Sequence, residues 1–165
     1  MKIIVMSDSH GDRTTIEKIT AEQADAYFHC GDSELTFEDE IFQNMSIVRG
    51  NCDVDSDFPE EVLAEVGGQK VLMVHGHRHN VKGFSLTLTY FAKQKGANIV
   101  LYGHSHLYGA EMYDGILFVN PGSTLLPRGG NPATYAVIEW DDKITVTFKD
   151  MDDEVVKVLE FALNK

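Results

Sequence analysis

Short apolar runs separated by polar turns recur along most of this chain. Runs without alternation, such as Ile3-Ile4-Val5-Met6, are typical of strands that are buried on both faces. Pairs of runs joined by two-residue turns such as Asp114-Gly115 indicate hairpins. In chain order, the predicted strands are residues 3–6, 26–30, 46–49, 61–66, 69–74, 99–102, 108–113, 116–120, 134–140 and 143–149.

Other segments place apolar residues at helical spacing. Asp12 can cap the first of these segments, and Gly96 can end the last one. Strand–helix units come first and hairpins follow, so we expect one α/β domain over residues 1–165, with two packed sheets and helices outside. The predicted helices are residues 13–23, 34–44 and 84–95, whereas residues 154–163 fit either a strand or a short helix.

Charge and composition narrow the classes of partner. The formal net charge of −12 argues against nucleic acid and against anionic membranes as partners. Two cysteines do not make a disulfide framework, and no apolar run approaches the length of a secretory signal or a membrane span. We therefore expect a reduced, cytoplasmic protein.

Metal-capable side chains directly follow five of the predicted strands, in most cases across a glycine that lets the backbone turn sharply. The carboxyl ends of strands in open α/β sheets are where ligands bind. Each motif taken alone reads as an ordinary polar turn, but coincidence explains the repeated pattern poorly. The candidate metal ligands are Asp8, His10, Asp32, Asn51, His75, His104 and His106.

Oxygen and imidazole donors without a required thiolate favour manganese, iron, zinc or a similar divalent ion over a closed cysteine zinc site. Seven ligands exceed what one tetrahedral ion takes. They suit two ions about 3.5–4 Å apart, joined by a bridging carboxylate and a bridging hydroxide that acts as nucleophile. We expect manganese, with iron, zinc and nickel as alternatives.

The ordered motifs Asp-x-His, Gly-Asp, Gly-Asn-x-Asp, His and Gly-His-x-His resemble those of the calcineurin-like metallophosphoesterase superfamily. The small size, the Cys in Gly-Asn-Cys-Asp and the later Asn-Pro-Gly-Ser resemble its compact prokaryotic phosphodiesterase branch. The resemblance implies a four-layer αββα sandwich, with two mixed sheets and a binuclear site at strand ends. It also implies hydrolysis of a phosphate ester, and we expect a small phosphodiester as substrate.

The same resemblance divides the ligands between two ions, with Asp32 as the bridge. It places Asp8, His10, Asp32 and His106 around one ion, and Asp32, Asn51, His75 and His104 around the other.

One departure from the family pattern concerns the proton donor. Many relatives carry a histidine where this chain has Cys52, and that histidine is thought to protonate the leaving group. His77 is a candidate replacement as the catalytic acid, and its alternative is a solvated loop histidine. We interpret His29 as structural and His79 as a surface residue.

Three other functions compete with the enzyme. The retromer small subunit, a protein-binding scaffold, resembles the same branch, but here every ligand position holds a competent donor. A phosphate-sensing flavodoxin-like domain would use Asp8 and one magnesium ion and leaves the histidines unexplained. A nuclease would perform the same reaction on a polyanion, which the net charge disfavours. The apolar helix over residues 84–95 fits core packing or a homo-oligomer interface, and the sequence does not name the natural substrate.

Overall fold

The computed structural model describes residues 1–81 and 85–163, whose strands form two sheets. The six-stranded sheet, in the order β11-β10-β9-β1-β2-β3, contains β1 (Lys2–Met6), β2 (Ala26–His29), β3 (Met45–Ile47), β9 (Thr134–Trp140), β10 (Lys143–Asp150) and β11 (Val155–Ala162). The five-stranded sheet, in the order β4-β5-β6-β8-β7, contains β4 (Glu61–Val66), β5 (Gln69–Val74), β6 (Ile99–Leu101), β7 (Gly109–Tyr113) and β8 (Ile116–Asn120).

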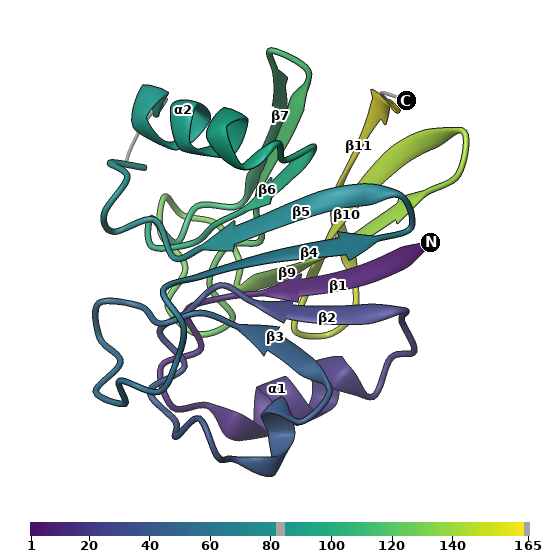
Figure 1. The fold of residues 1–165 in the computed structure, drawn as a ribbon. Helices are drawn as coiled ribbons and strands as arrows, with labels where there is room; N and C mark the ends of the chain where they lie inside the picture. The colour runs from purple at the N-terminus through teal and green to yellow at the C-terminus, as the bar shows by residue number, and fades with distance from the viewer. Residues whose placement is uncertain (82–84, 164–165) are drawn as a thin grey trace.

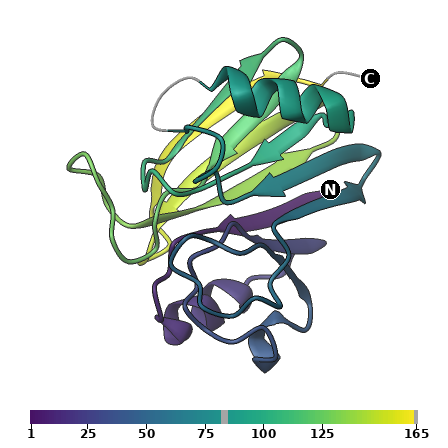
Figure 2. The same ribbon diagram turned by 60° about the vertical axis from the view of Figure 1, so that its left-hand side comes forward.

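The two sheets pack face to face, and one helix covers the outer face of each (Figures 1 and 2). Helix α1 (Arg13–Thr20) packs Ile16 and Ile19 against β1 and β9, and α2 (Leu86–Lys95) packs Leu88 and Ala92 against β5, β6 and β8. Apolar side chains from both sheets fill the space between them, among them Val5 and Met73. The predicted sandwich of two mixed sheets with helices outside is therefore confirmed.

Parallel pairing brings several strand ends to the same edge. In the first sheet β1 pairs in parallel with β2, and β2 with β3. In the second sheet β5 pairs in parallel with β6. Figure 1 shows the arrowheads of β1, β2 and β5 on the same side of the molecule, at the left. The loops after these strands are therefore neighbours although they lie far apart in the sequence.

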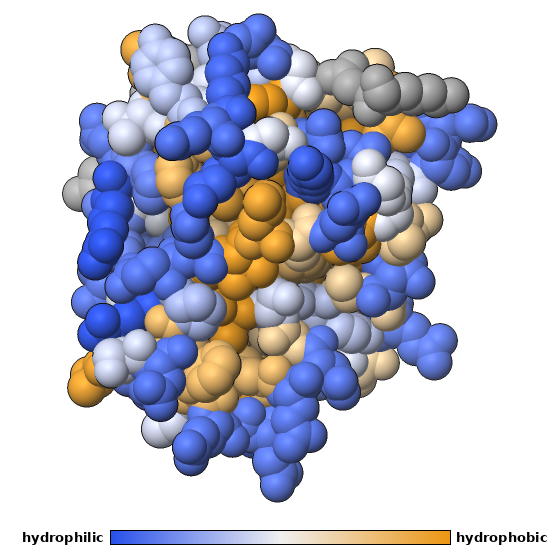
Figure 3. All heavy atoms as spheres, viewed as in Figure 1, coloured by the Kyte–Doolittle hydropathy of each residue, from blue (hydrophilic) through white to orange (hydrophobic). Residues whose placement is uncertain are grey.

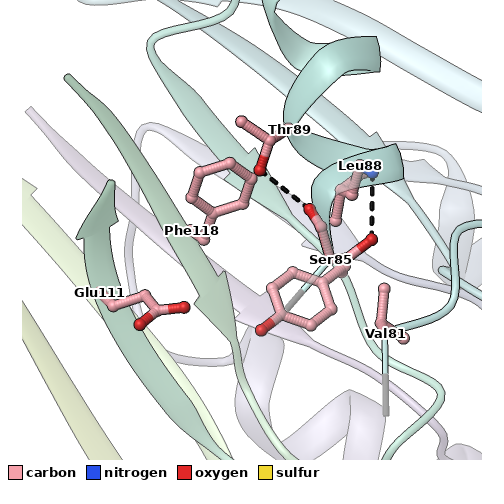
Figure 4. A pocket seen from close by; sticks show the side chains of 7 residues that line it. Val81, Ser85, Leu88, Thr89, Glu111 and Phe118 are labelled. Atoms are coloured by element: carbon pink, nitrogen blue, oxygen red, sulfur yellow. Dashed lines mark hydrogen bonds between the residues drawn. The ribbon is translucent and has the colours of Figure 1, made fainter. Parts of the chain in front are cut away.

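Local hydrogen bonds define the ends of α2. The Ser85 side chain accepts a hydrogen bond from the N–H of Leu88, and the Thr89 hydroxyl donates to the Ser85 carbonyl (Figure 4). Gly96 ends the helix in a left-handed conformation with φ of 69°, as a C-terminal glycine cap does. The predicted start of this helix at Phe84 lies outside the described residues.

The predicted helix over residues 34–44 is wrong, because this segment is a loop that contains only the short 3₁₀ helix Glu40–Phe42. Glu34 has a left-handed φ of 55°, and its N–H donates to Asp53. The N–H of Phe37 donates to Asp55. These carboxylates accept hydrogen bonds from N–H groups near the start of the segment. Of the apolar residues that suggested a helix, Leu35, Ile41 and Phe42 pack beneath the loop, whereas Phe37 is exposed.

Two other predictions needed adjustment at the ends of elements. Helix α1 stops at Thr20, three residues before the predicted end at Gln23, and residues 154–163, left undecided, contain the strand β11. A band of hydrophobic side chains runs down the middle of the face shown in Figure 3. No helix in the described parts of the chain is long and apolar enough to cross a membrane.

Candidate metal centre

The candidate ligands from the two sheets meet at the shared edge. Asp8 follows β1 and Asp32 follows β2, whereas His75 follows β5 and His104 follows β6. The His104 N–H donates to Asp8 Oδ2 over 3.1 Å, and His75 Nδ1 donates to the Cys30 carbonyl over 2.7 Å. These bonds tie the loops of one sheet to those of the other, so the site spans both halves of the sandwich.

Asp8 lies at the centre of this cluster and is fully buried. Its Oδ2 accepts hydrogen bonds from Ser7 and from the His104 backbone. Its Oδ1 has no hydrogen-bond partner in the described structure, yet three imidazole nitrogens surround it. The Nε2 atoms of His106, His75 and His10 lie 3.3, 3.7 and 3.9 Å away from it.

The Nδ1 atom of each of these three histidines already has a hydrogen-bond partner. In each ring Nδ1 faces an oxygen that can only accept a hydrogen bond, so Nδ1 carries the proton. In the neutral ring Nε2 therefore presents a lone pair towards Asp8. The acceptors are the Glu34 carboxylate for His10 at 3.0 Å, the Cys30 carbonyl for His75 at 2.7 Å and the Leu126 carbonyl for His106 at 2.7 Å.

Asp32 and Asn51 approach the same His75 nitrogen from another side. Asp32 Oδ2 lies 3.2 Å from His75 Nε2, and Asn51 Oδ1 lies 3.1 Å from it. Burial would raise the pKa of Asp32, but His75 and the N–H of Cys52 outweigh it and hold the pKa below its usual range. Burial would likewise raise the pKa of Asp8, and His106 and His75 lower it. Both carboxylates are therefore ionised at neutral pH.

This donor set fits a divalent cation. A buried carboxylate oxygen without a partner and three lone pairs aimed at it repel one another unless positive charge lies between them. Ligand atoms lie within 4.8 Å of one another in three groups, which are Asp8, His10 and His106; Asp8, Asp32 and His75; and His10, Asp32 and Cys52.

The third group contains a thiol that the sequence prediction left out of the ligand set. Cys52 is an exposed residue overall. The partial burial of its sulfur atom and the nearby negative charge of Asp32 raise the pKa of the thiol to about 11. The thiol therefore stays protonated at neutral pH while no cation is bound.

His104 and His77 lie next to the cluster. Their ring centroids are 5.2 and 5.4 Å from the ring of His75, and 6.2 Å from each other. Both are half-buried. Burial and His75 lower the pKa of His77, and its Nδ1 has no hydrogen-bond partner in the described residues. His77 is thus a neutral imidazole at the margin of the site.

Most candidate ligands occupy an unusual backbone conformation. A left-handed φ at a residue other than glycine costs energy and is concentrated at functional sites, and Asp and His are among the residue types that tolerate it better. The residues and their φ values are Asp8 (54°), His10 (43°), Asp32 (58°), His104 (71°) and His106 (61°).

Two supporting residues were missed by the sequence analysis. The buried carboxylate of Asp53 accepts hydrogen bonds from the N–H groups of Asp32, Glu34 and Gly50. Ser123 donates from its hydroxyl to the Asp8 carbonyl over 2.7 Å. Each of these residues is the last one of a motif already described, Gly-Asn-Cys-Asp for Asp53 and Asn-Pro-Gly-Ser for Ser123. Their position within these motifs was the only sequence signal for their supporting role.

Comparison with known sequences yields one family and several relatives. The model of the calcineurin-like phosphoesterase superfamily domain matches residues 1–143. The probable metallophosphoesterase YsnB of Bacillus subtilis is 38% identical over 164 residues, which is 97% of each chain. The phosphodiesterase YfcE of Escherichia coli is 31% identical over 121 residues, which cover 67% of this chain and 61% of that protein.

Solved structures agree with this result. A predicted phosphoesterase from Streptococcus pneumoniae superimposes with a TM-score of 0.93 at 38% identity, covering 98% of this chain and 97% of that chain. A Vps29 variant from Entamoeba histolytica has a TM-score of 0.77 at 21% identity, covering 99% of this chain and all (100%) of that chain. At this identity the second likeness shows a shared fold and nothing further.

Proposed function

Since the chain belongs to the calcineurin-like phosphoesterase superfamily, we propose that it is a phosphodiesterase that hydrolyses small phosphodiesters with two divalent ions. The observation that carries this proposal is Asp8 Oδ1, buried without a partner and surrounded by the Nε2 atoms of three histidines. Manganese is the proposed metal, because the donors are carboxylate, amide and imidazole groups. The name of the Escherichia coli relative supports a diester rather than a monoester.

The proposed ligands divide into two sets that share one carboxylate. The contacts of Asp32 with His75, and its grouping with His10, suit a residue between two ions. Asn51 and His104 complete the second set from the exposed side. The first ion would be held by Asp8, His10, Asp32 and His106, and the second by Asp32, Asn51, His75 and His104.

When bound, such ions neutralise the phosphoryl oxygens and acidify water, so that hydroxide is available near neutral pH. The chain itself orients the reacting groups. His77, with a free Nδ1 beside the cluster, would hydrogen-bond the leaving ester oxygen. The formal net charge of −12 favours a small substrate over a long polyanion. Cys30 and Cys52 are free thiols, and a reduced, cytoplasmic location belongs to the same proposal.

Turnover of an aryl phosphodiester in the presence of manganese tests this function. We expect measurable hydrolysis by the wild-type protein and a loss of at least 100-fold in Asp32→Asn and His75→Ala, because each removes a ligand from the cluster. Asp142→Asn, which changes an exposed carboxylate in the β9–β10 turn, is the control and should leave the rate unchanged.

Full activity in Asp32→Asn would contradict the assignment of the site. Inactivity of the wild-type protein with manganese, iron, zinc and nickel, together with tight capture of a protein partner, would favour the scaffold instead.

A further inference from the structure

A cavity of about 180 Å³ lies directly beside the cluster, on the side that faces α2. Its lining includes His75, His77 and His79 from the loop after β5, and Phe91 from α2. The ring of His77 contacts both this cavity and the cluster histidines, since its centroid lies 5.4 Å from that of His75. A molecule with its phosphoryl group at the cluster could therefore extend past His77 into the cavity.

One side of the cavity is aromatic. The rings of His79 and Phe91 lie with centroids 5.1 Å apart and planes inclined by 33°. His79 was expected on the surface, but it is half-buried against α2, and burial lowers its pKa, so the ring is neutral at pH 7. Together the two rings form a largely apolar surface suited to a flat group.

The polar atoms of the cavity fall into two kinds. The carboxylates of Glu60 and Glu61 are already paired, with Arg78 at 3.5 Å and Lys95 at 3.0 Å respectively. The Nδ1 atoms of His77 and His79 are buried and have no hydrogen-bond partner in the described structure. A neutral ligand that brings one or two hydrogen-bonding atoms would satisfy these nitrogens without disturbing the ion pairs.

We propose that this cavity binds an aromatic ester group of the substrate, so that aryl phosphodiesters are the preferred class. This inference rests on the proposed function. The volume suits the ligand, because a cavity of about 150 Å³ holds a benzene ring. The cavity under α2 drawn in Figure 4, lined by Ser85, Leu88 and Phe118 among others, has only about 20 Å³, room for roughly one water molecule.

Binding of two phosphate monoesters, the kind of product that hydrolysis would leave, tests the inference. Titration calorimetry on the manganese-loaded protein would compare phenyl phosphate with methyl phosphate. We expect phenyl phosphate to bind roughly tenfold more tightly or better, because a buried ring removes apolar surface from water. Phe91→Ala should reduce this preference to less than about threefold. The matched control is Tyr90→Ala, an exposed aromatic on the same helix that should keep the preference.

A second variant keeps the test valid if Phe91→Ala does not fold. His79→Trp would fill the cavity from the loop and should remove the preference for phenyl phosphate while methyl phosphate still binds. Equal affinity of the two phosphates for the wild-type protein, or an unchanged preference in both variants, would overturn the inference and leave the proposed function standing. Failure of both phosphates to bind the manganese-loaded protein would count against the proposed function, and the inference would fall with it.

Discussion

The environment of the Asp8 carboxylate favours a positive charge in the cluster. Its Oδ1 is buried and faces the Nε2 atoms of three histidines. The Nδ1 atom of each of these rings already donates a hydrogen bond elsewhere. The nearby Asp8 carboxylate raises the pKa of the His106 ring. Burial lowers the pKa of His75, but Asp32 and Asp8 outweigh it and raise that pKa. Protons would therefore compete with the proposed cations for the same nitrogen lone pairs.

Gly50 offers a test at the scale of one residue. A Cβ atom there would lie 2.0 Å from Asp32 Oδ1 and 2.5 Å from the Asp32 backbone nitrogen, so Gly50→Ala must displace Asp32. We expect manganese affinity, measured by titration calorimetry, to fall by about 10- to 100-fold, the usual effect of disturbing a ligand's support. Gly109→Ala is the control, because a Cβ there meets nothing within 4 Å. Equal affinities in the two variants would show that Asp32 does not depend on this close approach.

Side-chain type and position after a strand were enough to choose the candidate ligands from the sequence, and their role as ligands stays a prediction. The residues that hold these ligands in position could not be predicted from the sequence in the same way. Ser123 bonds Asp8 across 115 positions of sequence, and serine after glycine reads locally as a turn. His79 was misplaced because only the packing of α2 brings Phe91 over it.

Among the elements, the hairpins followed best from the sequence. The turn residues Gly67-Gly68 and Asp114-Gly115 all have positive φ, as two-residue hairpin turns require, and this local chemistry sets the register of the flanking strands. The helix predicted over residues 34–44 is absent because contacts distant in sequence, rather than local ones, determine this segment. Its N–H groups bond to Asp53 and Asp55, which lie in another loop and cannot be seen from local spacing.

The end of β2 is tied to the loop after β1 by a buried histidine. The N–H of Gly31 donates to His29 Nδ1, so His29 Nε2 carries the proton and donates to Ser9 over 2.8 Å. Burial lowers the pKa of His29 to about 4. Unfolding frees the ring to take up a proton near its ordinary pKa of about 6.5. The unfolded state therefore binds more protons between pH 6.5 and 4, and stability falls as the pH falls through this window.

His29→Gln should reduce this pH dependence. A pKa lowered from about 6.5 to about 4 corresponds to about 3 kcal/mol, so the wild-type protein should lose about 3 kcal/mol more unfolding free energy than the variant between pH 7 and 4. Urea unfolding of both metal-free proteins at several pH values measures this difference. The contributions of the other histidines are common to both proteins and cancel. Parallel stability curves for the two proteins would contradict the buried, neutral state of His29.

At the scale of the whole molecule, the packing of two sheets creates the site. Each sheet alone would present only part of the donor set, because Asp8 and Asp32 follow strands of one sheet while His75 and His106 follow strands of the other. The surrounding protein is acidic, with a formal net charge of −12. A phosphate ester would be repelled by this field, and the cations proposed at the edge of the sandwich would supply the local positive charge that it needs.

The number of manganese ions bound per chain tests the central claim most directly. Chelator-treated protein would be titrated with manganese and then analysed for metal after removal of free ions. We predict two ions per wild-type chain, and fewer than one in Asp32→Asn, because Asp32 is the proposed shared ligand. A wild-type chain that binds no more than one ion, or an Asp32→Asn variant that still binds two, would contradict the account.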